Sequence, residues 1–193
     1  MLFRSVFPVK EIVFSKKNNA KVVAISFFGF AYISLCWGLM ISLRSWTFLQ
    51  NRNFNGNAFD LGSVMVITLI ASIWINDTMA YIVGSLIGKT PLTKISPKKT
   101  WEGTAGGAVL AIVAVSSLFY FLIDKNYLFE VIGIAAIAAI IGTLGDLLES
   151  KLKRLANVKD SGSFMPGHGG FLDRFDSLLL ATPFVWLFLW FFS

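Results

Sequence analysis

Residues 145–176 read GDLLESKLKRLANVKDSGSFMPGHGGFLDRFD, and this charged stretch lies between two apolar segments. The segments cover 128–148 and 175–192, and each has close to the roughly 20 residues that an α-helix needs to cross a bilayer. A charged connection between two such spans is held at the membrane surface, because ionised side chains are costly to bury in lipid. We therefore expect this stretch to fix the topology of the chain and to carry its polar chemistry.

Three further apolar runs precede this pair, at 22–43, 61–88 and 106–123, and only Asp77 interrupts the second with a charge. Over the whole chain 55% of residues are hydrophobic and 15% are charged, and the mean hydropathy is +0.69. Soluble domains carry about 25% charged residues. The composition therefore predicts an all-α fold, a polytopic helical membrane protein with about five transmembrane helices. We expect one membrane-embedded domain over residues 1–193.

The basic residues are distributed unevenly between the two sides of such a bundle. Segments 1–21, 89–102 and 149–174 hold most of them, whereas the alternate connections carry only Arg44, Arg52 and Lys125. Because Lys and Arg accumulate in cytoplasmic loops, the first three segments are predicted to be cytoplasmic. The same placement explains the net charge of +6 without nucleic acid, since no nucleic-acid-binding motif is visible.

The stretch that opens at Asp146 offers a face of polar side chains if the preceding helix continues. Spacings of i, i+3, i+4 and i+7 would align four residues: Asp146, Glu149, Ser150 and Lys153. Further on, Asp173 and Asp176 form a second acidic pair at i, i+3. Carboxylates beside many basic side chains suit a site that holds a divalent cation together with a polyphosphate. The charge content alone is equally compatible with a solvated loop that flanks a membrane span.

Asp77 is unusual because an ionisable residue within a span is costly and typically faces the bundle interior or a polar cavity. Gly84 and Gly88 lie near the same helical face, so a neighbouring helix could approach closely there. The alternative is a purely structural Asp satisfied by an adjacent helix.

The sequence ISPKKTWEG at 95–103 follows this span. Ser96 and Pro97 fix an extended backbone, and Lys98 and Lys99 present ammonium groups that suit phosphate. A solvated basic loop beside anionic lipid is the competing interpretation.

Two groups of residues resemble one known family. The first is Ser150-x-Leu152-Lys153-Arg154, Lys159-Asp160, His168-Gly169-Gly170 and Asp173-Arg174-x-Asp176; the second is Asp77-Thr78-x-Ala80-Tyr81, Gly84, Gly88, 95–103 and Gly106-Gly107. Both are similar to the motifs of the phosphatidate cytidylyltransferases, also called CDP-diacylglycerol synthases. The motifs fall within 76–107 and 145–176, and the resemblance covers about residues 60–176.

The resemblance implies transfer of a cytidylyl group from CTP to phosphatidate, giving CDP-diacylglycerol and pyrophosphate for phospholipid biosynthesis. It further implies Mg²⁺, a monovalent cation such as K⁺, membrane lipid as a partner, a homodimer, and an active site on the cytoplasmic face of a bacterial inner membrane. The implied catalytic residues are Asp146, Asp173, Lys153 and Lys159. The implied substrate-binding residues are Ser96, Lys98, Lys99, Ser150, Arg154, His168, Gly169, Gly170 and Arg174, and the implied metal ligands are Asp146, Asp173, Asp77 and Asp176.

Members of that family generally carry additional transmembrane helices before the matched region, so we expect this chain to be an N-terminally shortened member. Three alternatives stay open at this point. One is another CTP-using lipid enzyme, such as a polyprenol kinase or an archaeal-type lipid cytidylyltransferase. A second is an ion-coupled transporter in which Asp77 and Asp146 bind the coupling ion. A third is an inactive truncated copy.

Overall fold

The computed structural model describes residues 20–45, 61–93, 95–122, 125–158, 161, 170 and 172–192. Its long helices are α2 (Ala20–Arg44), α4 (Leu61–Ile87), α5 (Trp101–Leu122), α6 (Leu128–Leu155) and α7 (Leu172–Phe192). A 3₁₀ turn, η1 (Lys125–Tyr127), precedes α6. All 5 long helices are sufficiently long and apolar to cross a membrane. The prediction of an all-helical integral membrane protein with five candidate spans is confirmed.

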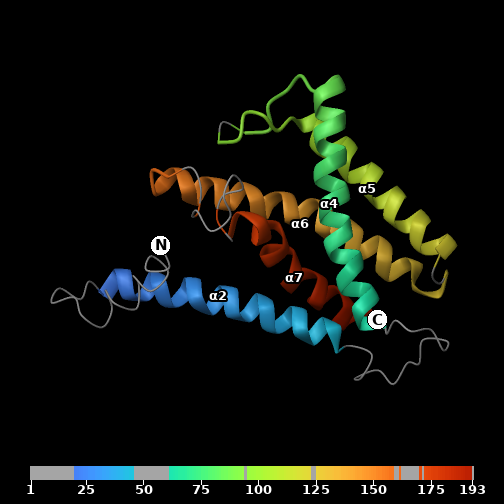
Figure 1. The fold of residues 1–193 in the computed structure, drawn as a ribbon, viewed down its shortest axis with the longest axis horizontal. Helices are drawn as coiled ribbons and strands as arrows, with labels where there is room; N and C mark the ends of the chain where they lie inside the picture. The colour runs from blue at the N-terminus through green and yellow to red at the C-terminus, as the bar shows by residue number, and fades with distance from the viewer. Residues whose placement is uncertain are drawn as a thin grey trace.

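The helices alternate in direction, so their connections gather at two ends of the molecule (Figure 1). α4 and α5 run side by side as one pair, α6 packs against α4, α5 and α7, and α2 lies along α7 and the start of α4. The start of α2, the α4–α5 connection and the end of α6 lie at one end. The described part of the α4–α5 connection, the end of α6 and the start of α7 thus lie at the same end of the bundle.

The centre of the bundle is filled by aliphatic side chains and small residues. The larger cluster draws on α2, α4, α6 and α7 and consists of Leu43, Leu61, Met65, Leu69, Ile73, Ile134, Ala138, Leu178, Ala181, Val185 and Leu189. In lipid, helices associate by close packing rather than by removing apolar surface from water, and small residues permit that approach. Large apolar side chains such as Phe121 and Phe191 are exposed on the outside of the bundle, where they can contact lipid.

The helices extend beyond the apolar runs, slightly at both ends of α2 and by three residues or more at three other boundaries. α5 begins at Trp101 rather than at 106, α6 continues to Leu155 rather than ending at 148, and α7 begins at Leu172 rather than at 175. Hydropathy measures only the apolar length of a span, whereas helical hydrogen bonding continues into polar residues at the membrane border. At α5 the reason is local, because Thr100 Oγ1 accepts the Gly103 N–H at 3.1 Å and caps the helix.

Candidate functional site

The connection between α4 and α5 is a tight hairpin. The Leu92 N–H donates to the Lys99 carbonyl at 2.7 Å, and the Trp101 N–H donates to the Thr90 carbonyl at 2.9 Å. At its tip the Lys99 N–H donates to the Ser96 carbonyl at 3.1 Å, which closes a turn over Ser96-Pro97-Lys98-Lys99. The predicted phosphate-binding lysines are therefore carried by an ordered hairpin.

Glu102 secures the base of this hairpin. Its carboxylate oxygens accept the backbone N–H of Lys89 at 3.2 Å and of Thr90 at 3.2 and 3.3 Å. From the sequence alone, no role was expected for Glu102. The available signal was its place in the first turn of α5, where a carboxylate is favoured by the helix dipole.

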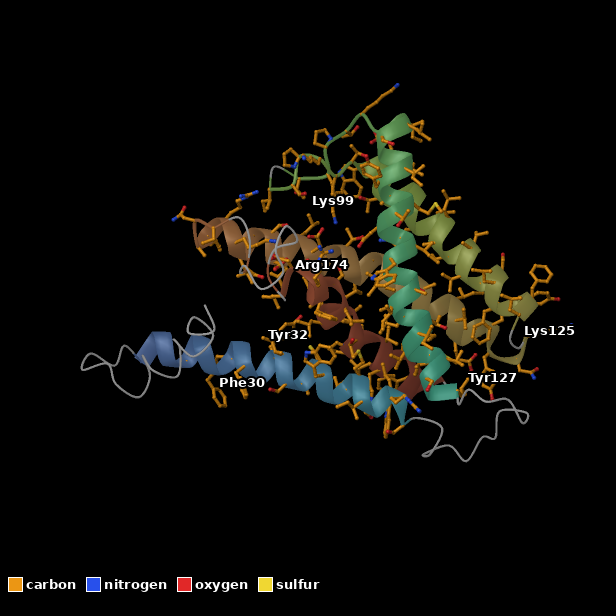
Figure 2. All side chains as sticks on the ribbon, viewed as in Figure 1. Phe30, Tyr32, Lys99, Lys125, Tyr127 and Arg174 are labelled. Carbon is orange, nitrogen blue, oxygen red and sulfur yellow. The ribbon has the colours of Figure 1, made fainter. Side chains whose placement is uncertain are left out.

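A cavity of about 370 Å³ opens between the hairpin, α4 and α6. Its lining includes the predicted site residues Asp77, Lys98, Lys99 and Asp146. Lys99 reaches from the hairpin to α6 and forms an ion pair with Asp146 (Figure 2). The carboxylate of Asp77, whose role the sequence left open, thus lines a cavity that it shares with Asp146.

The close approach of α4 and α5 shapes one wall of this cavity. A Cβ atom on Gly107 would lie 2.6 Å from the Ala80 Cα, and one on Gly103 would lie 2.8 Å from the Gly84 Cα. Only glycine permits these backbones to come so near. The expectation that the Gly84 face meets a neighbouring helix is confirmed.

Beside the cavity, three carboxylates converge where α6 meets α7. One oxygen each of Asp146, Glu149 and Asp176 lie within 4.8 Å of one another. The helices are close here because position 145 is glycine: a Cβ on Gly145 would lie 2.7 Å from the Asp176 carbonyl oxygen. Glu149 is only 5% exposed, and its Oε1 has no hydrogen-bond partner among the described residues. Such a group of oxygen ligands can hold a divalent cation.

Glu149 is a ligand candidate that was not predicted from the sequence. The i, i+3 spacing predicts that Glu149 shares a helical face with Asp146, but it does not predict whether that face contacts α7. The structure decides this point because the facing element, α7, comes from a distant part of the chain.

Asp173 lies in the first turn of α7 but outside that cluster. Its Oδ1 accepts a hydrogen bond from Lys153 Nζ at 2.7 Å, and Lys153 also donates to Glu149 Oε2 at 3.1 Å. Its Oδ2 accepts the Gly170 N–H at 2.7 Å. The structure therefore brings Asp173 and Lys153 together, and the metal-ligand role predicted for Asp173 stays a prediction.

The remaining predicted residues are placed as follows. Ser150 is half-buried on α6, while Arg154 on α6 and Arg174 on α7 are exposed. Lys99 and Arg174 lie at the end of the bundle opposite Lys125 (Figure 2). Lys159, His168 and Gly169 lie outside the described residues.

Comparison with known proteins shows to which family this chain is related. The model of the cytidylyltransferase family matches residues 1–192. The chain belongs to the cytidylyltransferase family. The family match reaches beyond the 60–176 region on which the resemblance was built and includes α2.

Among relatives of this cytidylyltransferase family member, a phosphatidate cytidylyltransferase of Bacillus subtilis is 39% identical over 165 residues, which is 84% of this chain and 56% of that protein. A phosphatidate cytidylyltransferase of Staphylococcus aureus is 43% identical over 112 residues, covering 58% of this chain and 43% of its own length. Phosphatidate cytidylyltransferase 4, chloroplastic, of Arabidopsis thaliana is 40% identical over 146 residues, which is 76% of this chain and 37% of that protein. The chain thus spans about half the length, or less, of these relatives.

Proposed function

We propose that the chain transfers a cytidylyl group from CTP to phosphatidate, forming CDP-diacylglycerol and releasing pyrophosphate. One observation carries the proposal: the carboxylates of Asp146, Glu149 and Asp176 converge within 4.8 Å directly beside a cavity that Lys98 and Lys99 also line. Acidic groups that can bind a metal and basic groups that can bind phosphate are thereby combined at one end of a membrane bundle. The family and the names of the relatives favour the same reaction.

The acidic cluster fits Mg²⁺. Its three donors are carboxylate oxygens, which Mg²⁺ prefers, and the unpartnered Glu149 Oε1 is an acceptor that a cation would satisfy. When bound, Mg²⁺ supplies positive charge to the phosphate oxygens of the nucleotide. Asp77, across the same cavity lining, adds negative charge near Asp146. The proposal that a monovalent cation such as K⁺ also binds is based on the family resemblance.

The residues of the chain then act by positioning and by neutralising charge. The phosphate monoester of phosphatidate has a second pKa of about 6, so at neutral pH it is already largely ionised and needs no strong base. One of its oxygens forms a bond to the α-phosphorus of CTP while the bond from that phosphorus to pyrophosphate breaks. Lys98 and Lys99 lower the repulsion between the two anions, and Lys153 is held beside Glu149 for the same purpose.

We assign the other substrate contacts from the resemblance, with the polar face of α6 as support: Ser96, Ser150, Arg154, Lys159, His168, Gly169, Gly170 and Arg174. The lipid tails stay in the bilayer while the phosphate head reaches the cavity past the exposed face of α4, where Tyr81 lines the cavity and is 77% exposed. The abundance of Lys and Arg in 1–21, 89–102 and 149–174 favours a cytoplasmic position for this end. The assignment to a bacterial inner membrane is based on the family resemblance.

The test uses membranes that contain this chain, phosphatidate, Mg²⁺ and CTP labelled either in the α-phosphate or in the γ-phosphate. The proposal predicts that only the α-label reaches lipid, and that Asp146→Asn abolishes the transfer. Lys125→Met, at the opposite end of the bundle, is the matched control and should leave transfer unchanged. Transfer of the γ-label would indicate a lipid kinase instead, and ion flux without lipid turnover would indicate a transporter. Either result, or no turnover at all, would refute the proposal.

A further inference from the structure

Asp173 has more hydrogen-bond partners than any other carboxylate in the described part of the chain. Its Oδ1 accepts from Lys153 Nζ at 2.7 Å, and its Oδ2 accepts the Gly170 N–H at 2.7 Å. The Ser161 N–H and Oγ each donate to Oδ2 at 2.9 Å, and the Ser161 N–H also approaches Oδ1 at 3.3 Å. One side chain thus joins α6, Ser161 and the residues that lead into α7.

These partners leave the Asp173 carboxylate little capacity for a metal. Each oxygen of an ionised carboxylate offers two lone pairs. Oδ1 accepts from Lys153 and, at 3.3 Å, from the Ser161 N–H, while Oδ2 accepts from Gly170 and from both donors of Ser161. Binding a cation would require breaking at least one of these bonds, all of which are charge-assisted because the acceptor is ionised. Two of the donors are shielded from solvent, since Lys153 is half-buried and Gly170 is buried. Glu149 differs in this respect because its Oε1 has no partner among the residues that the structure describes.

Lys153 joins Asp173 to the acidic cluster, and the Asp173 carboxyl also lies beside the carboxyl of Glu149. The Lys153 ammonium donates to Asp173 Oδ1 and to Glu149 Oε2, at 2.7 and 3.1 Å. A lysine side chain has four rotatable carbon–carbon bonds and loses much rotamer freedom when it is fixed. Two carboxylates on different helices restrict it far more than Glu149 alone would.

We propose that Asp173 is a positioning residue rather than a metal ligand: it holds the Lys153 ammonium, Ser161 and Gly170 in place beside the carboxylates of Asp146, Glu149 and Asp176. The purpose of the Lys153 ammonium, which is to neutralise phosphate charge, rests on the proposed function. The distinction between a positioning role and metal ligation for Asp173 rests on the hydrogen bonds alone. It changes the role that the family resemblance suggested for Asp173.

The deciding experiment measures Mn²⁺ binding to detergent-solubilised protein by electron paramagnetic resonance, without CTP or lipid. Asp173→Asn should keep the Mn²⁺ affinity of the unmodified chain within about threefold, whereas Asp176→Asn should weaken it by about tenfold or more, because only Asp176 supplies a ligand. The two variants are matched, since both replace a carboxylate by a carboxamide in the first turns of α7. Asp173→Ser, which keeps an acceptor for the Gly170 N–H, replaces Asp173→Asn if that protein does not fold. Equal weakening by Asp173 and Asp176 substitutions would overturn the proposal.

A double-mutant cycle between Asp173→Asn and Lys153→Met tests the positioning role by a second route that needs neither metal nor turnover. The Tm losses should be non-additive, with the double variant little worse than either single variant, because both changes remove the same contact. Additive losses would overturn the proposal. If the unmodified chain bound no Mn²⁺ or converted no phosphatidate, the proposed function would fail, and the cycle would still decide whether Asp173 acts through Lys153.

Discussion

Replacing Gly145 by alanine should separate α6 from α7 at the acidic cluster. The new Cβ would lie 2.7 Å from the Asp176 carbonyl oxygen and 3.1 Å from the Ser177 Cα. Ordinary contact begins near 3.4 Å, so the Asp176 carbonyl must move by about 0.7 Å, and because it is backbone the helix must move with it. Gly142→Ala is the matched control, since its Cβ would meet Ser177 Cβ at 3.5 Å on the same face of α6.

The two substitutions differ only in fit, because both remove a glycine from a helix interior. Alanine stabilises a helix by roughly 0.5–1 kcal/mol relative to glycine, and overpacking costs about 1–3 kcal/mol. Gly142→Ala should therefore be neutral or slightly stabilising, whereas Gly145→Ala should be less stable than Gly142→Ala by roughly 2 kcal/mol, or about 4–8 °C in Tm. Displacement of Asp176 should also lower CTP turnover by about tenfold or more.

The assays are thermal unfolding in detergent and α-labelled CTP incorporation in liposomes, run on both variants. Equal Tm values and equal turnover for Gly142→Ala and Gly145→Ala would refute the claim that the helix contact at Gly145 sets the geometry of the cluster. A lower Tm with full turnover would show that the contact stabilises the fold without positioning Asp176.

Three further predictions concern the hairpin and the metal. Lys99→Met should raise the KM for CTP by about tenfold through loss of a charge-assisted phosphate contact. Because the substitution also removes the ion pair with Asp146, the free energy of unfolding should change by less than about 1 kcal/mol. Steady-state kinetics and thermal unfolding measure the two effects, and an unchanged KM would contradict the phosphate-binding role of Lys99. Glu102→Ala should lower kcat/KM for CTP because the Thr90 N–H loses its acceptor. Glu102→Gln, which keeps one acceptor oxygen, should retain most of the activity. Equal activity of the two variants would contradict a role for the Glu102 hydrogen bonds in holding the hairpin. Treatment with EDTA should abolish CTP incorporation and added Mg²⁺ should restore it with unchanged circular dichroism, whereas turnover that persists in EDTA would exclude an essential divalent cation.

Much of the fold was predictable because membrane insertion depends on properties that the sequence displays directly. Apolar length located each long helix in the part of the chain that the structure describes, since a span must satisfy its own backbone hydrogen bonds and must present apolar side chains to lipid. The helix ends were less predictable. Thr100 extends α5 and the Lys153–Asp173 contact joins the end of α6 to the start of α7, and neither effect is visible in hydropathy.

The sequence by itself determined the all-helical membrane fold, the gathering of charge in two connections and the family. Only the tertiary structure decided which carboxylates meet. Asp146, Glu149 and Asp176 converge because Gly145 lets α7 approach α6, while Asp173, three residues from Asp176, is held instead by Lys153, Ser161 and Gly170. Helical periodicity fixes which residues share a face of one helix. It does not say which other helix that face contacts, because this depends on close packing between segments far apart in the chain.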